Sequence, residues 1–425
     1  MKINIENFLL VLFLIVLVFS NIYFVTPNSD TYLHYLVSKM IMKNPSILWE
    51  PHETEFLGGG QLLDINIYTS VTPLPNILYA FLFLIGIGPK IIDIISIIGI
   101  AYFLFKLDKR AIPFLFLSFL FIRISIFGGH DLLLLFLMLG IIYFFERKPK
   151  IAAIFAGFCP LVKTTGFIIL GAYILSLFIF KRKEIFTKNF YKNKFFIAFL
   201  ISILIIFPWY LRNFIFFDGD ILATLTGQSY SRIVEGEEWL KTGIQATQPE
   251  RYWWDASGYY PLPIDILFYI GLLFTAINFY RERKFDKELL FIIIFAVFYF
   301  SVQALNIQTL MSIRYILPIF PLLALQITKG VSEKYLKYFY VFCLIMLVFF
   351  MYNIPKYSFN ILDAQLTPVC NQAKAIVDYE PVYVKFLHNW FLIYKCDFNA
   401  VSEEQSIWTV DLEKGEVYKT NRSLS

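Results

Sequence analysis

Residues 131–184 read DLLLLFLMLGIIYFFERKPKIAAIFAGFCPLVKTTGFIILGAYILSLFIFKRKE, and this stretch decides the class of fold. It holds three apolar runs, which are separated first by the basic segment Arg147–Lys150 and then by the single Lys163. A helix that crosses hydrocarbon needs about 20 apolar residues, and fewer when charged side chains flank it. The stretch therefore predicts membrane-spanning helices joined by short turns.

The composition extends this prediction to the whole chain. Of its 425 residues, 58% are hydrophobic and 48 are Phe, and only 16% are charged. A soluble domain of this length could not bury so much apolar surface. The net charge of +5 comes from blocks of Lys and Arg between the apolar runs, which are retained on one side of a membrane during insertion. The composition thus predicts a membrane protein and excludes nucleic acid as a partner.

The loop charges predict the topology. Basic connections are typical of the cytoplasmic side, so we expect the N-terminus and five connections to be cytoplasmic. These connections are 106–110, 147–150, 181–194, 281–287 and 329–337. The fold class is an all-α polytopic membrane protein of the cell membrane, with about 11 transmembrane helices. The expected spans are 8–25, 90–105, 111–126, 131–145, 151–162, 166–180, 195–212, 263–280, 288–305, 314–328 and 338–354.

Two apolar segments need a separate interpretation. The first, 8–25, lacks a small-residue cleavage site before Thr26-Pro27, so we expect a retained span instead of a removed signal peptide. The second, 74–87, is apolar enough to cross the membrane. A crossing there would place the basic connection 106–110 on the external side, against the positive-inside rule. We prefer a helix at the outer interface that ends at Gly86-Ile87-Gly88-Pro89, and the alternative is one long kinked helix over 74–105.

The remaining loops and the tail are expected outside. The transmembrane domain covers 1–354 and carries the external loops 27–72 and 217–261. Residues 355–425 change composition and predict a small external α/β domain, with strands near 382–386 and 391–394 and a turn at Lys414-Gly415.

The four cysteines fall into two pairs. Cys159 and Cys343 lie in apolar runs and are expected to be buried packing residues. Cys370 and Cys396 lie in the tail, where an oxidising compartment would favour a disulfide, although their spacing does not establish proximity.

Four acidic or imidazole side chains are candidates for chemistry. Asp30 and His34 follow the first span at helical i and i+4 positions, so they would share a face. Asp30 is equally well placed as a helix cap. His130 and Asp131 follow Gly128-Gly129 at the tip of a predicted hairpin. Polar side chains at that depth are costly unless they face water, although Asp131 could also be a helix cap.

Three cations are expected on the same side. Lys163 interrupts an apolar hairpin and suits a lipid phosphate, with simple extension to the headgroups as the alternative. Arg212 ends one span, and Arg314, followed by Tyr315, begins another. Arginine donates two hydrogen bonds to phosphate at once, but both arginines could equally be interfacial anchors. The sequence has no zinc-type Cys/His spacing, phosphate-binding loop or catalytic serine elbow.

Six segments, in this order, carry a resemblance to a known family. They are Asp30-Thr-Tyr-Leu-His-Tyr35, Thr72-Pro-Leu-Pro75, Asp131-Leu-Leu-Leu-Leu-Phe136, Lys163-Thr-Thr-Gly166, Pro208-Trp-Tyr-Leu-Arg-Asn213 and Arg314-Tyr-Ile-Leu-Pro-Ile-Phe-Pro321. Together they resemble the GT-C superfamily of membrane glycosyltransferases, in particular polyprenyl-phosphate-mannose and aminoarabinose transferases. The resemblance covers residues 1 to 330 and not the tail. The protein O-mannosyltransferases of this family often carry Asp-Glu where this chain has Asp30-Thr31.

This resemblance implies an external active site, a polyprenyl-phosphate sugar as the donor, and inversion at the anomeric carbon. The acceptor would be a lipid, a glycan or a protein. Asp30, His34 and Asp131 are the expected catalytic residues. Lys163, Arg212, Arg314 and Tyr315 are expected to bind the lipid phosphate, and His130 to orient the acceptor. Asp131 and His130 could instead bind a divalent cation.

The main alternative is a transporter or flippase for lipid-linked sugars. It would need polar residues in the cytoplasmic halves of the spans, and those halves are nearly all Ile, Leu and Phe. A non-catalytic assembly subunit is a third alternative that one sequence does not separate from an enzyme.

Overall fold

The computed structural model describes most of the helical part of the chain and short pieces of its loops. The described residues are 5–23, 34–35, 37–39, 41–42, 45, 56–58, 61–63, 72–185, 190–216, 265–304, 313–353, 382–385, 407–411 and 416–419. Asp30, the loop 217–261, Cys370 and Cys396 lie outside them. The expectations for these positions stay predictions.

Helices account for most of the described residues. The α-helices are α1 (Ile5–Tyr23), α4 (Pro73–Leu84), α5 (Ile91–Asp108), α6 (Phe119–Phe127), α7 (His130–Phe144), α8 (Pro149–Val162), α9 (Gly166–Phe180), α10 (Arg182–Ile185), α11 (Lys194–Phe216), α13 (Ile266–Glu282), α14 (Lys287–Ala304), α15 (Phe320–Gly330) and α16 (Glu333–Asn353). Three 3₁₀-helices join them, namely η2 (Lys109–Leu117), η3 (Phe190–Lys192) and η5 (Ile313–Ile319). A helix lies in each of the eleven ranges expected to cross the membrane.

Only some of these helices meet the requirements for a membrane span on their own. Among the described residues three helices are long and apolar enough, namely Ile5–Tyr23, Lys194–Phe216 and Glu333–Tyr352. The pair α6 and α7 qualifies as a fourth if it is one span bent by 114°. Their faces carry large exposed apolar side chains, such as Phe19, Leu204 and Val348. The fold is therefore compatible with a membrane protein, and the total of eleven spans stays a prediction.

Two of the predicted spans are broken. The range 111–126 was expected to be one helix, but the chain forms η2 up to Leu117 and starts α6 after Ser118, whose hydroxyl accepts a hydrogen bond from the Phe121 backbone N–H at 3.0 Å. Pro113 inside η2 lacks the N–H that a regular α-helix needs. The range 314–328 is divided in the same way between η5, which contains Pro318, and α15.

The segment 74–105 is two helices and not one kinked helix. The first, α4, ends at Leu84. Gly86 follows with a φ of +72°, a backbone conformation that residues other than glycine rarely adopt. The second, α5, begins at Ile91. This agrees with the preferred interpretation of a separate helix, whose position at the membrane interface stays a prediction.

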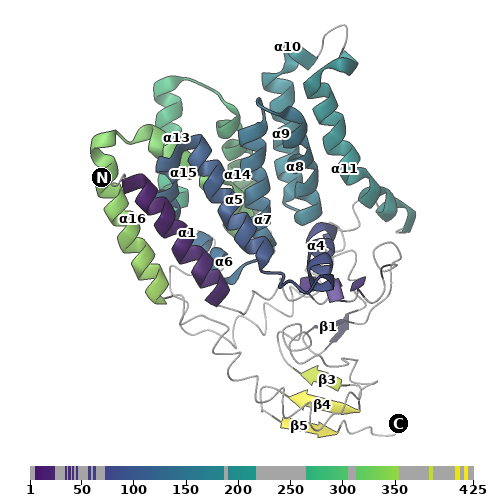
Figure 1. The fold of residues 1–425 in the computed structure, drawn as a ribbon. Helices are drawn as coiled ribbons and strands as arrows, with labels where there is room; N and C mark the ends of the chain where they lie inside the picture. Colours follow the sequence, from purple (N-terminus) through teal and green to yellow (C-terminus); the bar gives the residue numbers. More distant parts are fainter. Residues whose placement is uncertain are drawn as a thin grey trace. The chain divides into compact units, whose positions relative to one another are not determined.

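The chain divides into two compact units. The first contains residues 1–23, 90–210 and 232–357, and the second contains residues 24–89, 211–231 and 358–425. In the first unit α1, α5, α7, α8 and α9 lie side by side (Figure 1). The predicted division at residue 354 stays a prediction.

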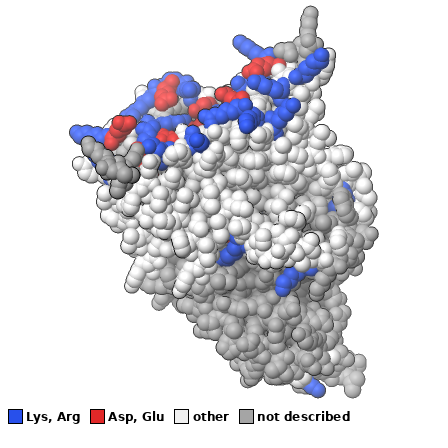
Figure 2. Space-filling model, in the orientation of Figure 1, with Lys and Arg blue, Asp and Glu red and all other residues white. Residues whose placement is uncertain are grey.

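Charged side chains of the first unit gather at one end of its helices, where α10 lies (Figure 2). Ion pairs join the predicted basic connections to acidic side chains at this end. Lys109 pairs with Glu6 at 2.7 Å, Lys181 with Glu146 at 3.4 Å, and Lys329 with Glu288 at 2.6 Å. The described parts of the five basic connections therefore share one end, which we call the charged end. This is the arrangement that the loop charges predicted, although its side of a membrane is not established.

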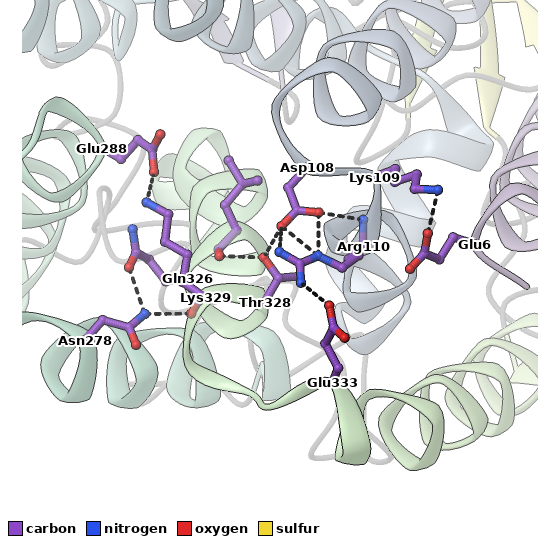
Figure 3. A network of polar contacts seen from close by, with 11 residues as sticks. Glu6, Asp108, Lys109, Arg110, Asn278, Glu288, Gln326, Thr328, Lys329 and Glu333 are labelled. Atoms are coloured by element: carbon purple, nitrogen blue, oxygen red, sulfur yellow. Dashed lines mark hydrogen bonds and ion pairs between the residues drawn. The ribbon is translucent and has the colours of Figure 1, made fainter. Parts of the chain in front are cut away.

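A network centred on Asp108 joins α5, η2, α15 and α16 at this end (Figure 3). The Arg110 guanidinium donates hydrogen bonds to the Asp108 carboxylate, the shortest at 2.8 Å, and the Thr328 hydroxyl of α15 donates another at 3.0 Å. Arg110 also lies 3.8 Å from Glu333 of α16. Burial disfavours the charged carboxylate, but these hydrogen bonds outweigh burial and lower the pKa of Asp108 below its ordinary value.

Aromatic rings fill the space between α5, α7 and α8. The Phe103 ring centroid lies 5.5 Å from that of Phe136 and 6.4 Å from that of Phe155. Gly99 and Gly140 make this possible, because a Cβ atom at either would overlap the ring of Phe136 or Phe155. Cys159 and Cys343 are buried free cysteines, as predicted.

The second unit contains two small sheets. In the first loop β1 (Phe56–Gly58) pairs antiparallel with β2 (Gln61–Leu63), with Phe56 opposite Leu63. In the tail β4 (Trp408–Asp411) pairs in parallel with β3 (Val382–Lys385) and antiparallel with β5 (Glu416–Lys419). The predicted strand at 382–386 is confirmed over four residues, whereas the predicted strand at 391–394 and the turn at Lys414-Gly415 lie outside the described residues.

Candidate functional site

An ion pair away from the charged end joins two of the predicted site residues. The Lys163 ammonium donates a hydrogen bond to the Asp131 carboxylate at 2.5 Å. Their side chains are 13% and 2% exposed. Asp131 lies in the first turn of α7, and Lys163 directly follows α8. Both helices reach the charged end with their other termini, so the ion pair lies at the opposite end, roughly 20 Å away at 1.5 Å per residue.

The turn before α7 positions Asp131. Gly128 and Gly129 have φ values of +80° and +135°, and this lets the chain turn through 114° between α6 and α7. The Gly129 backbone N–H donates to the Asp93 carboxylate at 3.1 Å. A Cβ atom at Gly128 would overlap this same carboxylate. Asp93, buried in the first turn of α5, thus fixes the turn from which His130 and Asp131 follow.

A second set of contacts holds α1 against this turn. The Asn21 side-chain amide donates to the backbone carbonyls of Ser125 and Ile126, at 2.9 and 3.3 Å. The Lys90 ammonium donates to the Asn21 carbonyl at 2.7 Å. Because Lys90 and Asp93 both lie at the start of α5, the ends of α1, α5 and α6 meet at the turn before Asp131.

The turn at Lys163 is equally constrained. Lys163 has extended backbone angles and ends α8, and Gly166 begins α9 three residues later. A Cβ atom at Gly166 would overlap the backbone of Cys159 and Pro160 in α8. The two helices therefore approach closely at this turn, which confirms the tight turn predicted there. The Lys163 side chain contacts Asp131 at this turn, and its predicted contact with a lipid phosphate stays a prediction.

Asp265 is a further buried acid of the first unit. Its carboxylate accepts from the Ser118 hydroxyl at 2.7 Å and from the Phe268 backbone N–H at 3.2 Å, so it caps α13 and ties it to the start of α6. These contacts give Asp265 a structural role.

The second unit holds His34 in a different network. His34 Nδ1 lies 2.7 Å from the Asn76 side-chain oxygen of α4, and the Asn76 amide donates to the Thr72 carbonyl at 3.1 Å. The Ser38 hydroxyl is hydrogen-bonded to the backbone carbonyls of His34 and Asn76. All four side chains are buried.

Of the remaining predicted site residues, the structure describes the side chains of Arg212 and His130. Arg212 is 1% exposed and donates to the Asn213 side chain at 3.0 Å, and its predicted contact with a lipid phosphate stays a prediction. His130 is buried beside Asp131 at the start of α7. Asp30 and the side chains of Arg314 and Tyr315 lie outside the described residues.

Sequence reasoning did not identify Asp93 or Asn76. Asp93 looks like an ordinary first-turn acid of an apolar helix, and only the folded chain shows that it contacts Gly129, 36 residues away. Asn76 directly follows Thr72-Pro-Leu-Pro75, one of the segments that carry the resemblance, and this was the one available signal for it.

Within the described ranges no three His, Cys, Asp or Glu side chains come together as metal ligands. The expected divalent cation at His130 and Asp131 therefore stays a prediction. Comparison with known proteins adds no family: no family model matches the chain, and no curated protein matches its sequence significantly.

Proposed function

We propose that this protein is a multi-pass glycosyltransferase of the cell membrane that moves a sugar from a polyprenyl-phosphate donor to a hydroxyl acceptor. The observation that carries the proposal is the buried Asp131–Lys163 ion pair at the end of the helices opposite the charged end. The resemblance of six segments to GT-C transferases gives this pair a function.

The proposed orientation follows from the charged end. Lys and Arg favour the cytoplasmic side of a membrane, so the charged end is cytoplasmic and the Asp131–Lys163 pair faces outward. An ion pair buried among membrane helices is costly to maintain, and charged residues inside membranes commonly mark substrate paths. The N-terminus is then inside, and the C-terminal residues 355–425 are outside.

The proposed reaction is a single displacement with inversion. The acceptor oxygen attacks the anomeric carbon from one side while the bond from that carbon to the phosphate oxygen breaks on the other. The electron pair of the broken bond leaves with the polyprenyl phosphate. The proton of the acceptor hydroxyl passes to Asp30, which His34 assists.

Lys163 stabilises the departing phosphate in this proposal. An ammonium group has three N–H donors, so one can bind Asp131 while the others bind phosphate oxygens. Asp131 holds the Lys163 side chain in place and keeps it charged, since an adjacent carboxylate favours the ammonium form. A fixed cation stabilises the charge that develops on the leaving group without reorganisation. Arg212, Arg314 and Tyr315 are proposed to contact the same lipid phosphate.

The test is incubation of the purified protein with a panel of polyprenyl-phosphate sugars and a membrane lipid extract as the source of acceptors. We expect one donor class to give free polyprenyl phosphate together with a glycosylated acceptor. The matched experiment places the same donors in one leaflet of proteoliposomes. Movement of intact donor to the other leaflet, without release of free lipid phosphate, would identify a flippase and refute the transferase.

A further inference from the structure

The structure assigns the tautomer of His34. We propose that Asn76 is a positioning residue that keeps the His34 proton on Nδ1, so that Nε2 is the only ring nitrogen able to accept a proton. The assignment itself rests on hydrogen-bond geometry alone. Its use in catalysis rests on the proposed function.

The argument starts from the Thr72 carbonyl, which can only accept hydrogen bonds. The Asn76 side-chain atom that lies 3.1 Å from it must therefore be the amide nitrogen. If the amide were turned over, two oxygen atoms would face each other at that distance. Thr72 thus fixes the orientation of the Asn76 side chain, and the amide oxygen is the atom that faces His34.

The next step follows from the chemistry of that oxygen. An amide oxygen has no proton, so the 2.7 Å contact with His34 requires a proton on Nδ1. In a neutral imidazole the other nitrogen then carries the lone pair. A hydrogen bond at one ring nitrogen commonly decides in this way which form the other nitrogen takes.

Hydrogen bonds and ring packing hold the His34 ring against the Asn76 side-chain amide. The Ser38 hydroxyl lies 2.5 Å from the His34 carbonyl and 3.0 Å from the Asn76 carbonyl, which joins the two backbones. The Tyr35 and Tyr79 rings meet edge to face at 5.0 Å, and His34 meets Tyr79 at 6.5 Å. His34 is 6% and Asn76 4% exposed, so water competes little for their hydrogen bond.

The consequence for the proposed reaction is a defined path for one proton. The proton of the acceptor hydroxyl passes to Asp30, and when it passes on from Asp30 to His34 it binds Nε2 and gives an imidazolium. The other proton stays on His34 Nδ1, and the Asn76 side-chain oxygen accepts an equally good hydrogen bond from the charged ring. Asn76 itself takes no proton and touches no reacting atom.

The tautomer can be measured without any activity. The whole chain, with ¹⁵N-labelled histidine, is placed in lipid nanodiscs, and nitrogen NMR distinguishes protonated from unprotonated ring nitrogens. The chain has four histidines, so a His34→Gln variant assigns the signals. We expect a protonated Nδ1 and an unprotonated Nε2 for neutral His34. A proton on Nε2 in the unmodified protein would overturn the assignment.

Three variants separate positioning from general damage. In Asn76→Leu the acceptor is lost, and we expect a mixture of tautomers. Asn76→Gln keeps both the amide oxygen and the amide nitrogen and should restore the Nδ1 proton, which also covers the case in which Asn76→Leu does not fold. Ser38→Ala removes a hydroxyl that touches only backbone carbonyls, and it should leave the tautomer unchanged. An unchanged tautomer in folded Asn76→Leu would show that Asn76 does not control it.

Turnover provides a separate readout. With the donor that the panel identifies, His34→Gln should lower kcat by about 100-fold or more, and Asn76→Gln should recover more turnover than Asn76→Leu. Full turnover of His34→Gln would refute the catalytic use of Nε2 and leave the tautomer intact. If no donor is turned over, the proposed function fails while the NMR result still decides the tautomer.

Discussion

Lys163 and Asp131 form an ion pair at 2.5 Å although 32 residues and two helix ends separate them in the chain. The pair joins the turn between α8 and α9 to the first turn of α7. The ion pair therefore links the α6–α7 hairpin to the α8–α9 hairpin at the end opposite the charged end. A separate set of ion pairs links helices at the charged end.

Removal of one partner of this pair should destabilise the protein more than removal of both. Asp131→Leu or Lys163→Met alone removes the ion-pair partner of a largely buried charge, which typically costs about 3–5 kcal/mol. The double variant should recover much of that loss, because well-packed apolar side chains can replace a buried ion pair. Unfolding in detergent by a double-mutant cycle measures the coupling, and additive losses would argue against a direct interaction.

The glycine turn before α7 should not accept a side chain. Gly128→Ala places a Cβ atom against the Asp93 carboxylate at a φ of +80°, so we expect a loss of about 1–3 kcal/mol from backbone strain alone. The matched control is Gly171→Ala in the interior of α9, where nothing lies within 4 Å of the added Cβ. That change should be neutral or stabilise the helix by roughly 0.5–1 kcal/mol. Equal effects of the two substitutions on the melting temperature would contradict the geometry of the turn.

Asp108 should make stability depend on pH at the charged end. Its pKa in the folded protein lies below the ordinary value, because hydrogen bonds from Arg110 outweigh the opposing effect of burial. The carboxylate therefore stabilises the fold above about pH 4, and this contribution is lost as the pH falls through the lowered pKa. Asp108→Asn should cost on the order of 1–3 kcal/mol at pH 7. The difference from the unmodified protein should shrink below pH 4 in denaturation profiles, and a constant difference would refute the assignment.

Much of the helical architecture could be predicted from hydropathy and loop charge. Apolar runs predicted a range for each of the longer helices of the first unit, and the described parts of the five basic connections do share one end (Figure 2). The breaks within these ranges were missed, because Ser118 and Pro318 lie in runs as apolar as any span. Their effect depends on caps and backbone hydrogen bonds that periodicity does not reveal.

The candidate site was predictable as a set of residues but not as a set of contacts. Asp131 and Lys163 stood out because charges in apolar runs are rare, yet nothing in the sequence paired them. Asp93 and Asn76 remained hidden because their roles depend on partners 36 and 42 residues away. Long-range pairing of this kind is decided by how helices pack, which the sequence pattern leaves open.

The central claim is that the lipid phosphate binds at the Lys163 end of α8 and not at the charged end of this helix. The most direct measurement compares turnover of polyprenyl-phosphate sugar by Lys163→Gln and Lys150→Gln, since Lys150 is an exposed lysine at the other end of the same helix. We expect Lys163→Gln to lose on the order of 10²–10³ in kcat, and Lys150→Gln to keep full turnover. Full turnover by folded Lys163→Gln, or an equal loss in both variants, would contradict the account.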